Sequence, residues 1–357
     1  MIPRNGQAGW AREAGLLLVF AVIVLTMPEW LEWIGGYSAL ATKVTIWALF
    51  ALGFDILLGF TGYLSFGHAA FFGTAAYATG MSFRDFSPEI VPALLFSLAA
   101  TVPLALILGY LTLRRTGIYF SILTLAFAQM LHAAALSIFS DWTGGDNGLT
   151  MDVSPAFMGE DLSDRAIFYI AAGTLVVGYA IARQIRRSPF GLMLMAIKEN
   201  PMRLEYTGAH LRIYKIAAFV ISALYGSVAG FLMVVYEPYV ATKYLHWSTS
   251  GELVIMSVIG GVNTLIGPMI GATFMLYFEN VVQGYLGEQW KLVLGIIFVL
   301  VVIFVPGGFV DMYNRARRRL GMVARLRRPN VPDAPGSIEE ERARPRNVQA
   351  RHELPTE

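Results

Sequence analysis

Cysteine is absent from the 357 residues, and charged residues are scarce. Without cysteine, the chain has no disulfide framework, thiolate nucleophile or cysteine-ligated metal. Only 15% of the residues are charged and 56% are hydrophobic, whereas a soluble domain carries about a quarter charged residues. These shortages exclude an ordinary soluble enzyme, a disordered protein and a nucleic-acid binder. The formal net charge is only +2, so the distribution of charge is more informative than its total.

Motifs for catalysis and nucleotide binding are also missing. The chain contains no Gly-Lys dipeptide, so it has no phosphate-binding loop of the Walker type. No paired carboxylates, histidine cluster or nucleophile–base arrangement stands out. The sequence therefore predicts a protein that is not an enzyme and that has no cofactor or metal of its own.

Long apolar runs are what the sequence does have. A helix needs roughly 20 apolar residues to cross a hydrocarbon core about 30 Å thick. An interrupted run at 251–283 contains Gly260-Gly261 and Gly267-Pro268, which predicts a broken or re-entrant pair of helices. We therefore expect an all-α polytopic integral membrane protein with eight full spans and this pair, or 8–10 spans. The full spans are expected at about 14–34, 39–60, 62–81, 90–111, 117–139, 166–183, 214–236 and 289–310.

The first apolar run has the beginning of a secretory signal but not its end. Arg4 and Arg12 precede the run, and Pro28 and two tryptophans, Trp30 and Trp33, follow it in place of a small-x-small cleavage site. We interpret the run as an uncleaved membrane anchor whose tryptophans lie at the interface.

Basic residues concentrate in three of the regions that flank or connect the apolar runs. These regions are 114–115, 183–215 and 315–319. The positive-inside rule places them, and with them both termini, in the cytoplasm. The acidic loop 141–164 then falls on the outer side, from which the pair at 251–283 must both enter and leave.

The composition changes near the C-terminus. Residues 315–328 are rich in arginine, and prolines recur among mixed charges in 329–357. We predict a transmembrane domain at 1–314 and a disordered basic cytoplasmic tail at 315–357, beginning at the anionic inner leaflet.

Charges inside the apolar runs are few. Lys43, Glu252 and Glu279 lie where they can reach an interface, and only Asp55 is deep enough to be a functional charge. A proton- or sodium-coupled transporter usually needs such groups near the midplane. Their scarcity weighs against that class.

Two glycine-rich segments, 59–73 and 260–272, differ from simple lipid-facing helices. Glycine lets helices approach closely, and it also breaks helices and exposes backbone groups to a cavity. A translocation pathway and tight helix packing therefore both remain open, as does an internal repeat. For His68 in the first segment, and for Gln129 in the predicted span 117–139, a hydrogen bond within the helix packing is the default interpretation. The candidate pathway residues are Gly62, Ser65, Gly67, His68, Gln129, Gly261, Gly267 and Pro268.

An outer loop and a cytoplasmic loop carry further patterns. The outer loop is a tight turn system made of Thr143, Gly144, Gly145, Asp146, Asn147 and Gly148. In the cytoplasmic loop 184–213, Ser188-Pro189 offers a helix start, Pro201 restarts the helix and Gly208 fits a C-cap. Leu192, Met195, Ala196 and Glu199 fall on roughly one face of the helix. Such a helix either docks a partner or lies at the membrane interface, and the residues leave both open.

These segments, taken in order, resemble the membrane permeases of branched-chain amino-acid ABC importers, most closely the M-type subunit of the LIV system. The matching segments are GYLSFGHAA at 62–70, TGGDNGL at 143–149, and the segments 188–208 and 260–272. The resemblance covers about 15–310. The family often has glycine where this chain has Asn263.

The resemblance implies a translocation pathway for branched-chain or related amino acids in a bacterial inner membrane. It implies a second homologous permease, two cytoplasmic ATPases that bind the ATP, and a periplasmic binding protein. Permeases for urea or short amides look similar and are the alternative within the class; a self-contained secondary transporter is the alternative outside it. The residues expected to couple to the ATPases are Ser188, Gly191, Ala196, Glu199, Asn200 and Gly208.

Overall fold

The computed structural model describes residues 6–305, 307–315 and 317. The helices in the first half are α1 (Gly6–Leu25), α2 (Met27–Trp33), α3 (Ser38–Thr61), α4 (His68–Asp85), α5 (Ile90–Thr112), α6 (Ile118–Leu136) and α7 (Ser140–Thr143). Those that follow are α8 (Asp164–Arg187), α9 (Pro189–Glu199), α10 (Pro201–Glu205), α11 (Leu211–Tyr236), α12 (Trp247–Gly260), α13 (Ile266–Leu286) and α14 (Trp290–Phe304). Single 3-10 turns lie at η1 (Gly145–Asn147), η2 (Thr242–Leu245) and η3 (Gly287–Gln289).

The strands are short and serve only to tie loops together. They are β1 (Leu149–Thr150), β2 (Ala156–Phe157), β3 (Glu160–Asp161) and β4 (Tyr239–Val240). Strand β1 pairs with β4 and β2 pairs with β3, both in antiparallel register. The fold is therefore all-α, as predicted.

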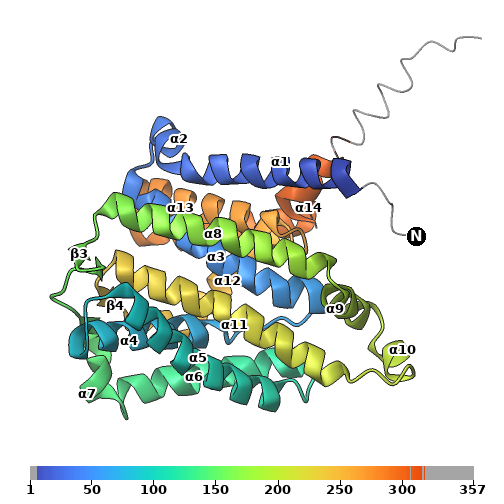
Figure 1. Ribbon diagram of the computed structural model, residues 1–357, viewed down its shortest axis with the longest axis horizontal. Helices are drawn as coiled ribbons and strands as arrows, with labels where there is room; N and C mark the ends of the chain where they lie inside the picture. The colour runs from blue at the N-terminus through green and yellow to red at the C-terminus, as the bar shows by residue number, and fades with distance from the viewer. Residues whose placement is uncertain (1–5, 306, 316, 318–357) are drawn as a thin grey trace, which may run out of the picture. The chain divides into compact units, whose positions relative to one another are not determined.

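The long helices run side by side, and the short elements gather at their two ends (Figure 1). Helices α9 and α10 lie at one end, on the right of the view, whereas α7, β3 and β4 lie at the opposite end. The predicted cytoplasmic loop and the predicted outer loop are thus at opposite ends of the bundle.

Five helices of the described part are long and apolar enough to cross a membrane: α3, α5, α6, α8 and α11. Two bent helix pairs raise this number to seven if each pair is one span. The chain is thus a polytopic membrane protein. Five of the eight predicted full spans correspond to single helices.

The other three predicted full spans are not continuous helices. The first run is bent by 58° between Leu25 and Met27, because Pro28 has no N–H to donate and its ring would clash in a continuous helix. The last run is bent by 41° between α14 and a helix at Gly308–Arg315, where Gly308 has a φ of +70°.

The third correction concerns the predicted span 62–81. Gly62 adopts the left-handed conformation, with a φ of +76°, and ends α3. The next five residues are not helical, and α4 begins only at His68. This helix of 18 residues is not among the five apolar ones, because His68 at its start and Arg84 and Asp85 at its end lower its mean hydropathy.

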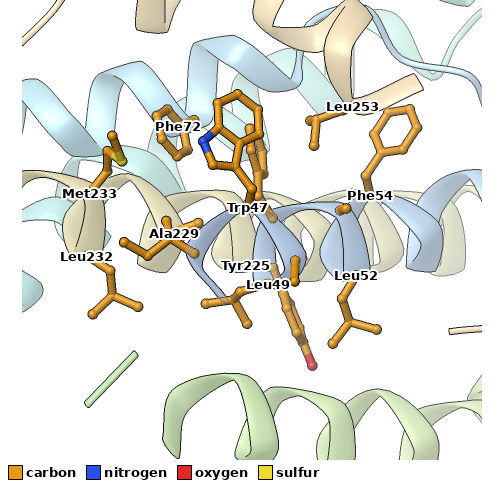
Figure 2. Packing of buried hydrophobic residues seen from close by; sticks show 14 of the residues in the cluster. Trp47, Leu49, Leu52, Phe54, Phe72, Tyr225, Ala229, Leu232, Met233 and Leu253 are labelled. Carbon is orange, nitrogen blue, oxygen red and sulfur yellow. The ribbon is translucent and has the colours of Figure 1, made fainter. Parts of the chain in front are cut away.

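Helices α3 and α11 form the centre of the bundle. Trp47 of α3 stacks on Phe72 of α4, with ring centroids 5.8 Å apart, and Figure 2 shows these rings beside Leu253 of α12 and Ala229 of α11. A Cβ atom on Gly53 would lie 2.2 Å from the Cβ atom of Tyr225. Glycine at this position therefore lets α3 and α11 cross in direct contact.

Candidate functional site

The interrupted pair predicted at 251–283 is present as α12 and α13, which are separated by a break at residues 261–265. Gly261, Asn263 and Leu265 have φ values of +117°, +68° and +64°. Asparagine is, after glycine, one of the residues that most readily adopts this region, whereas leucine is strained there. The backbone conformation of the break must therefore be stabilised by contacts from residues outside it.

Asp55, near the end of α3, holds this break. One carboxylate oxygen accepts a hydrogen bond from the backbone N–H of Asn263 at 2.7 Å, and the other accepts from Leu265 at 3.1 Å. The Asp55 side chain is fully buried. Asp55, the deep charge identified from the sequence, thus accepts hydrogen bonds from two backbone N–H groups. In a continuous helix, carbonyl groups of the preceding turn would accept these hydrogen bonds.

Backbones pack closely on both sides of the break, and a pathway role for Gly261, Gly267 and Pro268 stays a prediction. A Cβ atom on Gly260 would lie 1.8 Å from the carbonyl oxygen of Gly267, and one on Gly271 would lie 1.8 Å from that of Met256. Helices α12 and α13 therefore pack backbone against backbone. Pro268 is buried in the first turn of α13, where its missing N–H costs no helical hydrogen bond.

The residues before α4 are held by side chains of α6. Ser121 donates to the carbonyl of Leu64 at 2.6 Å, and Thr124 accepts from the N–H of Phe66 at 3.2 Å. The buried hydroxyl of Ser65 accepts from the N–H of Gly67 at 3.2 Å. These contacts explain why the chain stays extended here rather than continuing as a helix.

His68 is hydrogen-bonded and enclosed. Its Nε2 lies 2.8 Å from the hydroxyl of Ser222, which itself donates to the carbonyl of Gly53 at 2.6 Å. Since the one hydroxyl proton goes to Gly53, Nε2 must be the donor to Ser222. The rings of Phe54 and Phe71 meet the imidazole edge to face. This is the geometry of a packing histidine; a role in a pathway stays a prediction.

Gln129 does not show the hydrogen bond that its side-chain oxygen was expected to make. Its buried Oε1 has no partner among the described residues, and neither does Nδ1 of His132, one turn later. The ring of His132 lies 5.0 Å from that of His246, between centroids. These two histidines are far apart in the chain and neither lies in a motif, so the sequence gives no signal that they meet.

The predicted outer loop packs on the segment that follows α11. Gly144, Gly145 and Gly148 all have positive φ values, which is why this turn system needs three glycines. The Thr143 hydroxyl donates to the carbonyl of Ala135 at 2.6 Å, and the exposed Asp146 and Asn147 form the tip. Pairing of β1 with β4 joins this loop to residues 239–240.

In the segment predicted to couple to a partner, the expected helix starts are present, whereas the C-cap of α10 is Tyr206 and not Gly208. The Ser188 hydroxyl accepts from the N–H of Gly191 at 3.2 Å and caps α9, and the Asn200 side chain accepts from the N–H of Arg203 at 3.1 Å and caps α10. A Cβ atom on Gly191 would lie 2.1 Å from the carbonyl oxygen of Ile185. The turn from α8 into α9 therefore admits only glycine at this position.

Helix α9 buries one face and leaves the other open. Gly191, Leu194 and Ile197 are buried, whereas Leu192 and Glu199 are exposed and Ala196 is half-buried. The face picked out from the sequence is thus the outward one. Gly208, beyond α10, is exposed with a φ of +79°.

A lysine on α9 joins this segment to the core. The Lys198 ammonium donates to the carbonyl oxygen of Gly59, in the last turn of α3, at 2.9 Å. A cation is favourable at the C-terminal end of a helix, where carbonyl groups lack partners. One turn earlier, Asp55 holds the break between α12 and α13. The end of α3 thus contacts both α9 and the break.

Helices able to span a membrane, an internal broken pair and a capped surface helix at one end define a polytopic membrane protein. The family model described as branched-chain amino acid transport system / permease component matches residues 36–302. The chain belongs to this family, which is one of transport permeases and not of enzymes. The match includes every candidate pathway and coupling residue named above.

Two similar proteins are permeases of the same kind. The chain is 25% identical to the high-affinity branched-chain amino acid transport system permease protein LivM of Escherichia coli K12, over 83% of this chain and 75% of that protein. It is 24% identical to the LivM protein of Salmonella typhimurium LT2, over 83% and 74%. No solved structure matches the chain.

Proposed function

We propose that this chain is a permease subunit of an ATP-binding-cassette importer that carries branched-chain or related amino acids across a bacterial inner membrane. The observation that carries the proposal is the family match over residues 36–302. Two relatives that each share about three quarters of their length with this chain are named for branched-chain amino-acid transport, which supports this substrate class.

The proposal includes the way the chain crosses the membrane. The five long apolar helices, the two bent pairs and α4 would make eight crossings. The pair α12 and α13 would be re-entrant from the outer side, since α12, with 14 residues, rises only about 21 Å. Both termini and helix α9 would then be cytoplasmic.

The proposed assembly contains a second, homologous permease, two ATPases and a periplasmic binding protein. The ATPases would bind the ATP and dock on the exposed face of α9. The binding protein would deliver substrate to the opposite end, beside the outer loop. Scarce charge inside the spans fits this arrangement, because a permease driven by separate ATPases needs no coupling ion.

Uptake into proteoliposomes tests the proposed function. The complex is isolated from native membranes through a tag on this chain and is reconstituted with ATP inside the vesicles. We expect ATP-dependent uptake of labelled leucine and no uptake by the chain alone. Uptake of urea in place of leucine would assign the chain to the short-amide transporters, and ion-driven uptake by the chain alone would refute the ATP-driven mechanism.

Replacing Glu199 with tryptophan is expected to uncouple ATP hydrolysis from uptake. The side chain is exposed in the last turn of α9, so a bulky ring there obstructs docking without disturbing the core. Leucine uptake should fall at least about tenfold, which corresponds to about 1.4 kcal/mol, while the amount of inserted protein stays the same. Val177→Trp, exposed midway along α8 and away from both ends of the bundle, is the matched control. Equal uptake by the Glu199→Trp variant and the wild type would contradict a docking role for α9.

A further inference from the structure

A polar pocket lies at the end of the bundle opposite α9. It has a volume of about 370 Å³ and is formed by α3, α12, α13, η2 and the residues around the end of α11. This volume lies within the roughly 300–1,000 Å³ of small-molecule sites. Part of its lining, at residues 237–241, directly adjoins the outer loop through the pairing of β1 with β4.

Five charged side chains of both signs line this pocket. They come from separate parts of the chain and are Lys43, Glu237, Lys243, Glu252 and Glu279. In the sequence, Lys43, Glu252 and Glu279 are separate charges within reach of an interface. The fold instead brings them together around one pocket, in a protein with few charged residues inside its spans.

The ion pairs in the pocket are loose. The Lys43 ammonium lies 3.4 Å from a Glu237 carboxylate oxygen, and the Lys243 ammonium lies 3.6 Å from one of Glu252. Charge-assisted hydrogen bonds in tight pairs are about 2.7–2.9 Å long. Within the described residues, no ion pair engages Glu279. Both signs of charge therefore have unused bonding capacity toward the pocket.

Apolar side chains complete the lining. Trp47, Met233 and Tyr244 are buried residues whose surfaces reach the pocket, together with Leu40 and Leu276. A small molecule in this pocket would thus meet cations, anions and an apolar wall at once. Among small molecules, an α-amino acid with an aliphatic side chain has this combination.

We propose that this pocket is a reception site for a zwitterionic amino acid. The substrate carboxylate binds between the ammonium groups of Lys43 and Lys243, and its α-ammonium binds the carboxylate of Glu279. The aliphatic side chain lies against Trp47 and Met233. The assignment of this site to uptake rests on the proposed function, whereas the binding itself does not.

Protection of a single introduced cysteine from labelling tests the site. Because the chain has no cysteine, Gln283→Cys at the exposed rim of the pocket gives a single reporter in the purified chain in nanodiscs. At about 20 mM leucine and a Kd of a few millimolar, occupancy should slow labelling by a maleimide roughly fivefold. Glu160→Cys, exposed in β3 at the same end and outside the pocket lining, is the control and should label at an unchanged rate.

Two analogues and two variants identify the contacts. 4-Methylpentanoate lacks the ammonium and 3-methylbutylamine lacks the carboxylate, and neither should protect the cysteine. Glu279→Gln, added to the Gln283→Cys chain, should abolish protection by leucine, whereas Glu279→Asp should retain part of it. Size-exclusion profiles identical to that of the parent chain establish that both variants are folded.

The outcomes separate this site from the proposed function. Absence of protection by leucine, equal slowing at Glu160→Cys, or protection by either analogue overturns the site, even if the complete complex takes up leucine. Protection by leucine with no uptake by the complex keeps the site and refutes the proposed function. Loss of protection in Glu279→Gln but not in Glu279→Asp supports the assigned contact.

Discussion

Replacing Asp55 with alanine is expected to open the break between α12 and α13 and to abolish uptake. The substitution leaves the backbone N–H groups of Asn263 and Leu265 without the acceptors that they have now at 2.7 and 3.1 Å. Each unsatisfied buried group costs about 1–3 kcal/mol. Leu265 also has a positive φ, which leucine does not maintain without outside support. The segment should therefore relax.

Hydrogen exchange measures this effect directly. Peptides that cover residues 261–266 should exchange about 10–100-fold faster in Asp55→Ala, because a loss of 1.4 kcal/mol in opening free energy corresponds to a factor of ten. Thr79→Ala is the matched control, since this buried hydroxyl bonds only to the carbonyl of Ala75 in its own helix. Exchange in 261–266 at the wild-type rate would show that Asp55 does not hold the break.

Gly67→Leu is expected to destabilise the chain and to block uptake. A Cβ atom at this position would lie 2.6 Å from the carbonyl oxygen of Thr124 in α6, so α6 or the segment before α4 must move. Overpacking of this kind costs about 1–3 kcal/mol. The apparent Tm of the purified chain should fall by roughly 2–10 °C.

A second glycine provides the comparison for Gly67→Leu. Gly173 of α8 has open space around its Cβ position within the described structure, so Gly173→Leu should keep the wild-type Tm and insertion level. The informative measurement is the difference in Tm between the two leucine variants. A Tm for Gly67→Leu equal to that of Gly173→Leu would mean that α4 and α6 do not pack as closely as the structure shows.

Apolar content proved a good guide to which segments enter the bundle and a poor guide to where a helix is continuous. The interruption of 251–283 was predictable, because paired glycines and a proline break a helix locally. The extended residues before α4 were not, because they depend on hydroxyl groups of Ser121 and Thr124 more than fifty residues away. The bend before Pro28 has a local signal, because proline interrupts a helix. Apolar content alone nevertheless predicts one continuous span there.

The candidate site shows the same limit. The starts of α9 at Ser188-Pro189 and of α10 at Pro201 follow from neighbouring residues and were predicted. The contact of Lys198 with Gly59 spans 139 residues, and that of Lys43 with Glu237 spans 194. The periodicity of a single sequence does not predict contacts between residues so far apart in the chain. For that reason the charged pocket emerged only from the structure.

The distance in sequence between Asp55 and the break has a consequence for the order in which the protein is completed during synthesis. Asp55 is made 208 residues before its partner Asn263. Until α12 and the break arrive, the carboxylate of α3 has no backbone N–H groups to accept from, although it belongs to the central helix. A nascent chain that ends before residue 261 therefore leaves a charge without partners in the bundle. The growing protein remains an unfinished membrane domain, open to quality control, until its last third has been made.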